Sequence, residues 1–317
     1  MAKPIAVVGS INLDLAISAA HIPRPGETLL GTGFGVFTGG KGANQAAAAA
    51  RLGYPTFMTG RVGDDPYAET LLTELRATGV RTDHVTRAQG PSGVAVIVSA
   101  ASGENSIIVA PGANNSLLPR ELESSAAAIR GAAAVLTQLE IPLETVEALA
   151  RMTASAGVPL ILDPAPARPL PAELLARVDW ITPNETEAQL LTGASSSPSS
   201  EDGIRALAEH FLSIGPRNIL LKLGERGAYL ATSDGLRMMI PAFAVTAVDT
   251  TAAGDAFNAG FAVALARGRC PADAARFASA VAALSVTRRG ALPSLPTEDE
   301  VTAFLAIQSS PKQEMSL

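Results

Sequence analysis

The sequence contains a single cysteine, Cys270, in 317 residues, so no disulfide can form within the chain. Although 47% of the residues are hydrophobic, no run approaches the ~20 uncharged apolar residues that a membrane-spanning helix needs. Acidic residues outnumber basic ones, and the net charge of -6 argues against a general surface for nucleic acid or anionic lipid. No signal peptide precedes the first apolar run, so we expect a soluble, cytoplasmic protein.

Two familiar nucleotide-binding motifs are absent as well. The Gly-x-x-x-x-Gly-Lys-Ser/Thr loop does not occur, and Gly31-x-Gly33-x-Gly35 lacks the final spacing of the dinucleotide fingerprint. No helix follows these glycines directly, so a dinucleotide-dependent oxidoreductase is disfavoured. The hydrophobic content is enough for the large core of one α/β domain, or of two at most.

Short apolar runs alternate with segments of helical periodicity over most of the chain. This order favours an α/β fold with a three-layer, doubly wound, mostly parallel sheet. We expect one domain over residues 1–307 and a disordered tail at 308–317, with a low-complexity loop at 195–200. The predicted strands are 5–8, 134–139, 159–162, 218–223, 228–231 and 242–248, and the predicted helices are 43–52, 67–78, 143–156, 256–267, 271–289 and 297–307.

Two segments do not fit this alternation. Residues 21–37 combine Pro23, Pro25 and several glycines with short apolar groups, and residues 93–110 contain two β-rich runs. We interpret them as a small β-sheet lid that projects from the main domain, with strands inserted at about 13–37 and 93–110. The alternative is a pair of surface hairpins with no role in catalysis.

The stretch from Asp249 to Gly260 lies between the predicted strand 242–248 and the predicted helix 256–267. Its turn would present unpaired backbone N–H groups of residues 252–255 at the positive end of a helix dipole, where an anion can bind. Asp255 stands in the same turn, where its carboxylate could accept a proton from an attacking hydroxyl. The alternative is a helix cap, because Asp is common in a first helical turn.

Polar side chains also follow the predicted strands. Asn12 and Asp14 come after strand 5–8, and Glu140 and Asp163 come directly after two others, at the edge where open α/β sheets bind ligands. Asx turns that close the strands are the alternative interpretation. The glycines of residues 39–42 precede the predicted helix 43–52, which would let a small ligand approach its backbone or would only permit tight helix–sheet packing.

Two of these segments resemble signatures of a known family. The run Asp249-Thr250-Thr251-Ala252-Ala253-Gly254-Asp255-Ala256-Phe257 resembles the second signature of the ribokinase, or PfkB-type carbohydrate kinase, family. The run Thr38-Gly39-Gly40-Lys41-Gly42-Ala43-Asn44-Gln45-Ala46 resembles the first. The similarity covers nearly the whole chain, from about Ile5 to about Leu305, and includes residues 9–14, 138–140, 163–168, 182–187 and 286–291.

The resemblance implies ATP-dependent phosphorylation of a pentose primary hydroxyl, the 5-hydroxyl of D-ribose. In this interpretation Asp255 is the general base, and the backbone of Ala252, Ala253, Gly254 and Asp255 forms the anion hole. The sugar ligands that the resemblance implies are Asn12, Asp14, Gly40, Lys41, Gly42, Asn44, Glu140 and Asp255. The implied nucleotide contacts are Asn184, Lys222, Gly224, Arg226, Gly227, Gly254 and Ser279. The segment Gly112-Ala113-Asn114 also resembles a family segment near the substrate, and Asp163 is expected to support its loop.

The resemblance further implies two metal ions. Glu187 would contact magnesium through water, although the spacing Asn184-x-x-Glu187 is equally typical of a capped helix start. A potassium ion would be held by oxygen atoms, mostly of the main chain, which suits a hard and weakly bound cation. The positions that match this potassium site are Asp249, Thr251, Ser285, Arg288, Gly290 and Ser294.

The family often pairs such lid strands between subunits, so the resemblance implies a homodimer through the β-sheet lid. Three other substrates remain open within the family: fructose, a keto-deoxy sugar acid and a nucleoside. A sugar acid would need an extra cation and a nucleoside an aromatic platform, which aromatic residues at 4% of the chain do not supply. A sugar or nucleotide sensor that kept the fold without the chemistry is the alternative from another class.

Overall fold

The structure is a computed structural model that describes residues 2–102, 104–193 and 200–309. Residues 195–199 of the predicted low-complexity loop and 310–317 of the predicted tail lie outside the described residues. The last helix, α10, continues to Ser309 rather than ending at residue 307. None of the described helices is long and apolar enough to cross a membrane.

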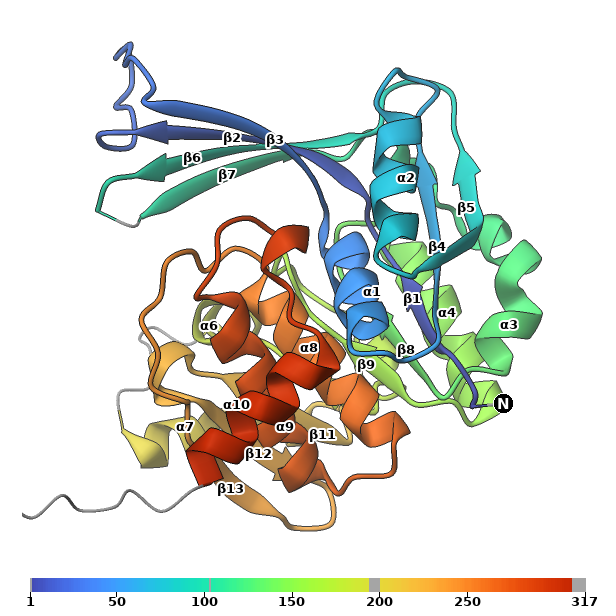
Figure 1. Cartoon of the computed structure of the whole chain (residues 1–317). Helices are drawn as coiled ribbons and strands as arrows, with labels where there is room; N and C mark the ends of the chain where they lie inside the picture. The colour runs from blue at the N-terminus through green and yellow to red at the C-terminus, as the bar shows by residue number, and fades with distance from the viewer. Residues whose placement is uncertain (1, 103, 194–199, 310–317) are drawn as a thin grey trace, which may run out of the picture.

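A nine-stranded sheet runs through the centre of the described chain, in the order β13-β12-β11-β10-β9-β8-β1-β4-β5 (Figure 1). Neighbouring strands from β5 to β11 are parallel, and β12 is antiparallel to both of its neighbours. Its strands are β1 Ile5–Val8, β4 Thr56–Val62, β5 Arg81–Arg87, β8 Ala134–Thr137, β9 Leu160–Leu162, β10 Trp180–Ile181, β11 Asn218–Lys222, β12 Ala228–Thr232 and β13 Arg237–Ile240.

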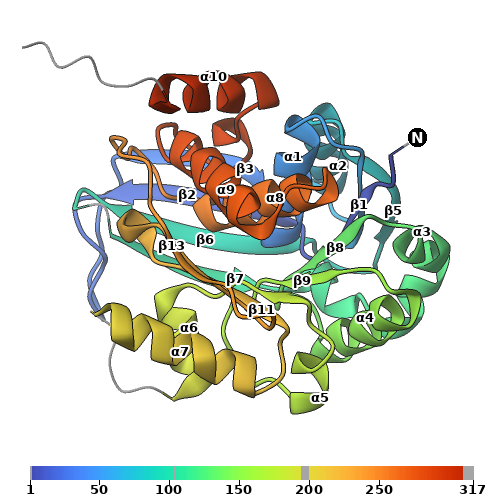
Figure 2. The same cartoon turned by 90° about the horizontal axis from the view of Figure 1, so that it is seen from below.

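Helices cover both faces of this sheet, which confirms the predicted three layers (Figure 2). The alternation along β1 shows why its sequence is apolar throughout: Ile5 and Val7 pack into one core, and Ala6 and Val8 into the other. On one face lie α1 Lys41–Arg51, α2 Ala68–Ala77, α8 Ala253–Ala266, α9 Pro271–Ser285 and α10 Glu298–Ser309. On the other lie α3 Ala126–Arg130, α4 Leu143–Ala156, α5 Ala172–Leu175, α6 Glu185–Thr192 and α7 Glu201–Ser213.

A second, four-stranded sheet projects from the main body (Figure 1). Its order is β3-β2-β6-β7, with β2 parallel to β6 and antiparallel to β3. The chain enters it almost directly from β1, because β2 begins at Asn12. The strands are β2 Asn12–Ala19, β3 Gly33–Gly39, β6 Gly93–Ala100 and β7 Asn105–Ala110.

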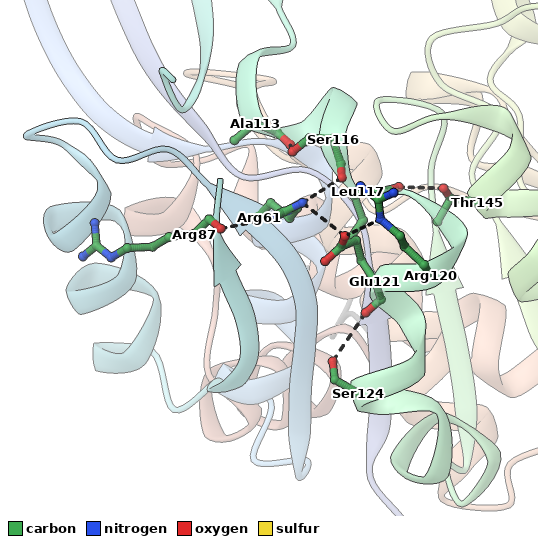
Figure 3. A network of polar contacts seen from close by, with 9 residues as sticks. All are labelled: Arg61, Arg87, Ala113, Ser116, Leu117, Arg120, Glu121, Ser124 and Thr145. Carbon is green, nitrogen blue, oxygen red and sulfur yellow. Dashed lines mark hydrogen bonds and ion pairs between the residues drawn. The ribbon is translucent and has the colours of Figure 1, made fainter. Parts of the chain in front are cut away.

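A polar network centred on Arg61 anchors the segment that follows the second sheet (Figure 3). This segment contains two 3₁₀ helices, η1 Gly112–Ser116 and η2 Pro119–Ser125. The Arg61 guanidinium on β4 donates to the carbonyls of Ser116 and Arg87, at 3.0 and 2.8 Å, and lies 3.5 Å from the Glu121 carboxylate. These contacts tie η1 and η2 to the edge of the main sheet.

Two predictions about local structure near the turn before α8 are wrong. Residues 242–248 form no strand: β13 ends at Ile240, and Pro241 has no N–H with which to extend the ladder. Within this segment, Phe243 packs edge-on against Phe304 of the C-terminal helix. Helix α9 ends at Ser285 rather than at residue 289, because Val286 O accepts hydrogen bonds from the amides of Val248 and Asp249.

Candidate functional site

A cleft of about 790 Å³ lies where the carboxyl ends of the parallel strands meet the second sheet. Side chains that are distant in the sequence come together here, since Asn12 follows β1, Glu140 follows β8 and Asp163 follows β9. Most of the predicted site residues line the cleft. These residues are Asn12, Asp14, Gly40, Lys41, Asn44, Glu140, Asn184, Glu187, Lys222, Gly224, Thr251, Ala252, Ala253, Gly254 and Asp255.

Several predicted site residues lie outside the lining of this cleft. The Gly42 N–H donates to Ser10 Oγ, and a side chain at Gly42 would meet the Gly9 carbonyl carbon at 2.6 Å, so the lack of a side chain here lets α1 approach the end of β1. Ser279 is buried in α9, and its hydroxyl has no partner among the described residues. The other predicted residues outside the lining are Arg226, Gly227, Asp249, Ser285, Arg288, Gly290 and Ser294.

Hydrogen-bonding groups beside β2 and the start of α1 are held by their neighbours in the cleft. Glu140 Oε2 accepts from the Ser10 hydroxyl at 2.5 Å, from the Asn12 amide at 3.3 Å and from the Lys41 N–H at 3.4 Å. The Asn12 amide oxygen accepts from Asn114 Nδ2 at 2.7 Å, and Asn114 is itself bonded to the backbone of β1–β2 at Ile11. This set of fixed carboxylate and amide groups suits a ligand with several hydroxyls.

Charged groups in the cleft shift one another's pKa values. Burial, and then the negative charges of Glu140 and Asp255, raise the pKa of the Asp14 carboxyl from 3.8 to about 7. Asp14 Oδ1 is buried and has no hydrogen-bond partner among the described residues. Burial by itself would lower the pKa of Lys41, but carboxylates around it, that of Asp255 first, raise this pKa above its usual value. Lys41 is therefore charged, and Asp14 lacks the partner that a bound ligand could provide.

The start of α8 has the geometry of an anion site. Its N-cap, Ala252, is the only non-glycine residue with a positive φ, 60°, in the described parts of the chain. The Ala253 N–H donates to Thr250 O at 3.2 Å, whereas the amides of Ala252, Gly254 and Asp255 donate to no acceptor within the described residues. Three backbone donors thus remain available to an anion at the positive end of the helix.

The Asp255 carboxylate lies at this same helix start, almost fully buried. Its Oδ2 accepts from Asn44 Nδ2 and its Oδ1 from Gln45 Nε2, both at 3.0 Å. The pKa of Asp255 is raised to about 6, with burial as the largest cause. The positive charge of Lys41 lowers it and the negative charge of Asp163 raises it. The hydrogen bonds from the Asn44 and Gln45 amides lower it. A carboxylate with a pKa near neutrality is suited to accept a proton.

Three residues at the base of the cleft were missed or underestimated from the sequence. Gln45 donates to both Asp255 and Asp163, Gln138 donates to Gln45 at 2.6 Å, and the Asp163 carboxylate accepts from Lys222 Nζ at 2.9 Å. Gln45 and Gln138 both lie in segments that match the family, which was the available signal. Nothing in their spacing along the chain shows that they touch.

The part of the cleft where nucleotide contacts are predicted is built around the start of α6. Asn184 and Glu187 form a reciprocal capping box, in which each side chain accepts from the backbone N–H of the other at 2.8 Å. Both residues also line the cleft, so the capping and ligand interpretations are compatible. Arg226 pairs with Glu185, and a side chain at Gly227 would lie 2.0 Å from Ile240 O, so that position requires close backbone packing.

The predicted potassium positions lie around a pair of loops. The Asp249 carboxylate accepts from the backbone N–H groups of Thr251 and Gly290, both at 2.9 Å, which joins the loops before α8 and after α9. Against the effect of burial, hydrogen bonds from the Thr251 side chain and from the Gly290 and Thr251 backbone, together with the Arg289 charge, lower the pKa of Asp249. The Arg288 guanidinium is engaged with Glu300 at 2.6 Å, so only its main chain can face a cation.

The described residues contain no cluster of three or more His, Cys, Asp or Glu side chains that could hold a metal ion. A magnesium ion in the cleft would therefore take most of its ligands from phosphates and water, as this ion commonly does. The carboxylate of Glu187 is compatible with an indirect, water-mediated contact. Oxygen donors around Asp249 are of the type that a monovalent cation prefers.

The raised pKa of Asp14 predicts a pH-dependent stability. Between pH 4 and 7 the folded protein binds this proton more tightly than the unfolded chain, so its free energy of unfolding falls as pH rises. Asp14→Asn removes the buried charge, and its stabilising effect should be larger at pH 8 than at pH 5 by on the order of 2 kcal/mol. Urea unfolding at both pH values measures the difference.

The matched control for Asp14→Asn is Asp83→Asn, which removes an exposed carboxylate with one surface ion pair. Its effect should stay within ~0.5 kcal/mol at both pH values. A gain of equal size at pH 5 and pH 8 for Asp14→Asn, or no gain at pH 8, would contradict the assignment.

Comparison with known proteins agrees with this geometry. A family model described as pfkB family carbohydrate kinase matches residues 2–298. The chain is 42% identical over 306 residues to the ribokinase of Haemophilus influenzae, covering 96% of this chain and 99% of the relative. It is 44% identical over 308 residues to the ribokinase of Bacillus subtilis, covering 96% and 100%. The solved structure of Arabidopsis thaliana ribokinase complexed with ribose and ATP superposes with a TM-score of 0.89 at 37% identity, over 96% of this chain and 99% of that one. The protein therefore belongs to the pfkB family of carbohydrate kinases.

Proposed function

We propose that this carbohydrate kinase transfers the terminal phosphoryl group of ATP to the 5-hydroxyl of D-ribose. The observation that carries the proposal is the position of Asp255, whose buried carboxylate lies beside unpaired backbone amides at the start of α8. A base and an anion site in one turn are what phosphoryl transfer to an alcohol requires. Ribokinases from two bacteria are 42% and 44% identical to this chain over nearly its full length.

Ribose would bind on the side of the cleft formed by β2 and the start of α1. The carboxylates of Asp14 and Glu140 can accept hydrogen bonds from its hydroxyls, and Asn12, Lys41 and Asn44 supply neighbouring polar groups. Asp14 Oδ1 has no protein partner, and neither does Glu140 Oε1 among the described residues. A polyol satisfies such acceptors better than an apolar ligand would.

Asp255 then removes the proton from the attacking hydroxyl as its oxygen attacks the phosphorus. The hydrogen bonds from Asn44 and Gln45 fix the direction of the carboxylate. The amides of Gly254 and Asp255, at the positive end of α8, stabilise negative charge on the group being transferred. Lys222 adds a positive charge nearby, since a methyl group built on Gly254 would lie 3.4 Å from Lys222 Nζ.

ATP would extend from this anion site toward α6 and η3 Gly224–Arg226, where Asn184 and Gly224 line the cleft. Magnesium, when bound, neutralises charge on the phosphates, and Glu187 would hold its water shell. Potassium, when bound between the loops at Asp249 and Gly290, would help to set the shape of the turn before α8.

The second sheet would act as a lid and as a dimer surface. Strand pairing places Asp14, Ala95 and Val109 on the face that lines the cleft. The residues between them point to the opposite face, where Phe34, at 69% exposed, and Ile108, at 72%, leave apolar area open to solvent. A second copy of this chain could cover this face, with lid packed on lid.

Ribose should give the highest turnover in an ATP-consumption assay that also contains deoxyribose, fructose and adenosine. Each buried polar group that loses its hydroxyl partner costs binding, so kcat/KM for deoxyribose should be at least ~10-fold lower. Omitting magnesium should abolish activity, and replacing potassium with a larger organic cation should reduce it. Higher activity on fructose or adenosine would replace the ribose assignment, and no activity on any of them would favour a sensor.

Asp255→Asn should lower kcat by at least ~100-fold, because a general base contributes about this much or more. The substituted amide keeps its size and can still accept from Gln45, so ribose binding measured by calorimetry should be largely kept. Asp83→Asn is the control for a distant carboxylate. Wild-type turnover in Asp255→Asn would remove this residue from the mechanism.

The lid dimer is tested by Ile108→Lys, which places a charge in the exposed apolar face. We expect the purified protein to change from a dimer to a monomer in light scattering after gel filtration, since a buried unpaired charge opposes association. Leu190→Lys, at a site on α6 with similar exposure, should leave the assembly unchanged. A wild-type monomer would refute the dimer directly.

A further inference from the structure

Gln45 joins two buried carboxylates that face different reactants. Its Nε2 donates to Asp255 Oδ1 at 3.0 Å and to Asp163 Oδ2 at 3.1 Å. Gln45 and Asp163 are buried, and so is Asp255. One side-chain amide group therefore supplies a hydrogen bond to the proposed base and, at the same time, to the carboxylate that holds Lys222.

The orientation of the Gln45 amide is set by its neighbour Gln138. Its carbonyl oxygen accepts from Gln138 Nε2 at 2.6 Å, which leaves the NH₂ group to face the two carboxylates. Gln138 in turn lies against Gly9 at the end of β1, where a methyl group would meet Gln138 Oε1 at 2.0 Å. The hydrogen bond from Gln138 therefore fixes which end of the Gln45 amide faces the two carboxylates.

Asp163 connects Gln45 to Lys222, near the proposed phosphate site. Its Oδ1 accepts from Lys222 Nζ at 2.9 Å, while its Oδ2 accepts from Gln45. The Lys222 ammonium lies beside Gly254, at the start of α8. The contacts Asp255, Gln45, Asp163 and Lys222 thus form an unbroken path from the base to a cation at the anion site.

We propose that Gln45 is a positioning residue for phosphoryl transfer, which sets the spacing between the Asp255 carboxylate and the Lys222 ammonium through Asp163. The proposal rests on the kinase function above. An attacking alcohol and a phosphoryl group must both be held in line, and a shift of about 1 Å in one partner can cost ~100-fold in rate. A shared amide couples the two positions in a way that two independent hydrogen bonds would not.

An amide suits this position because it donates to both carboxylates and accepts from Gln138. A carboxylate there would place a third negative charge against Asp255 and Asp163, and an apolar side chain would leave two carboxylates without their common donor. Asn has the right chemistry but is one methylene too short to reach both. The site therefore depends on the length of Gln45 as well as on its hydrogen-bonding groups.

The experiment compares wild type with Gln45→Met and Gln138→Met, using kcat, sugar KM and the pH dependence of kcat. Gln45→Met keeps the side-chain volume, so we expect kcat to fall ~10- to 100-fold while sugar KM changes less than ~3-fold. Loss of a donor to the base should also move the acidic limb of the profile upward by about one pH unit. Gln138→Met, which frees the amide to rotate, should shift both quantities in the same direction by less.

The charges that face Asp255 stay in place in these variants. Lys41 approaches it from the start of α1, Asp163 from the end of β9 and Asp14 from β2. Lys222 pairs with Asp163, and Glu140, at the end of β8, lines the same cleft. A shift in the profile therefore reports the lost amide rather than a changed charge. The double variant should be no worse than Gln45→Met alone, because both substitutions act through one contact.

Thr153→Val is the matched control, since it removes a buried hydroxyl from α4, whose hydrogen bonds are local to that helix. It should lower the melting temperature without moving kcat or the pH profile. Melting temperatures of all variants establish that they fold. The inference is overturned if Gln45→Met and Gln138→Met both keep the wild-type kcat and the wild-type acidic limb. The proposed function would still stand in that case, provided that the wild type phosphorylates ribose.

Discussion

The burial of an acidic side chain at the start of a helix is the constraint on which this site depends. Asp255 is 5% exposed, and an ionised carboxylate in such a place needs donors or cations around it. Asn44, Gln45 and the charge of Lys41 provide them, and all three belong to α1. The contact between α1 and α8 therefore forms part of the hydrophobic core and also the surroundings of the proposed base. It also explains why the two signature segments, far apart in the sequence, must fold against each other.

An excess of negative charge is the second feature of the cleft. Asp14, Glu140, Asp163, Glu187 and Asp255 line it, against the cations Lys41, Arg168 and Lys222. Part of this charge is balanced within the protein, as in the contact between Asp163 and Lys222. The remaining negative charge destabilises the folded protein, and the raised pKa values of Asp14 and Asp255 reflect this. Sugar hydroxyls and magnesium are ligands that would relieve this cost, so the same arrangement that weakens the empty protein favours its substrates.

The second sheet is connected to the chemistry by its first strand. Because β2 follows β1 after a few residues, Asn12 and Asp14 belong at once to the edge of the main sheet and to the base of the projecting one. Because the strands are pleated, alternate residues point to opposite faces of this sheet. One face lines the cleft, and the other is apolar and exposed. The Arg61 network holds η1 against the main sheet (Figure 3). Helix η1 carries Asn114, which donates a hydrogen bond to Asn12. Support for Asn12 thus extends to the outer edge of the sheet.

The sequence by itself determined the α/β class, most helices and strands, and the identity of the polar residues at the strand ends, because these depend on local periodicity and on short motifs. It predicted a strand at 242–248 and a longer α9, since local patterns cannot show that Pro241 ends a ladder or that Val286 O binds a distant loop. It also predicted Gly42, Gly227 and Ser279 as ligand contacts, and the structure places these three residues outside the lining of the cleft. Only the tertiary structure decided that Gln45 and Gln138 meet, that Asp163 holds Lys222 and that Asp255 is buried. These contacts join residues many positions apart, and their strength comes from the exclusion of water, which is a property of the folded molecule and not of any segment.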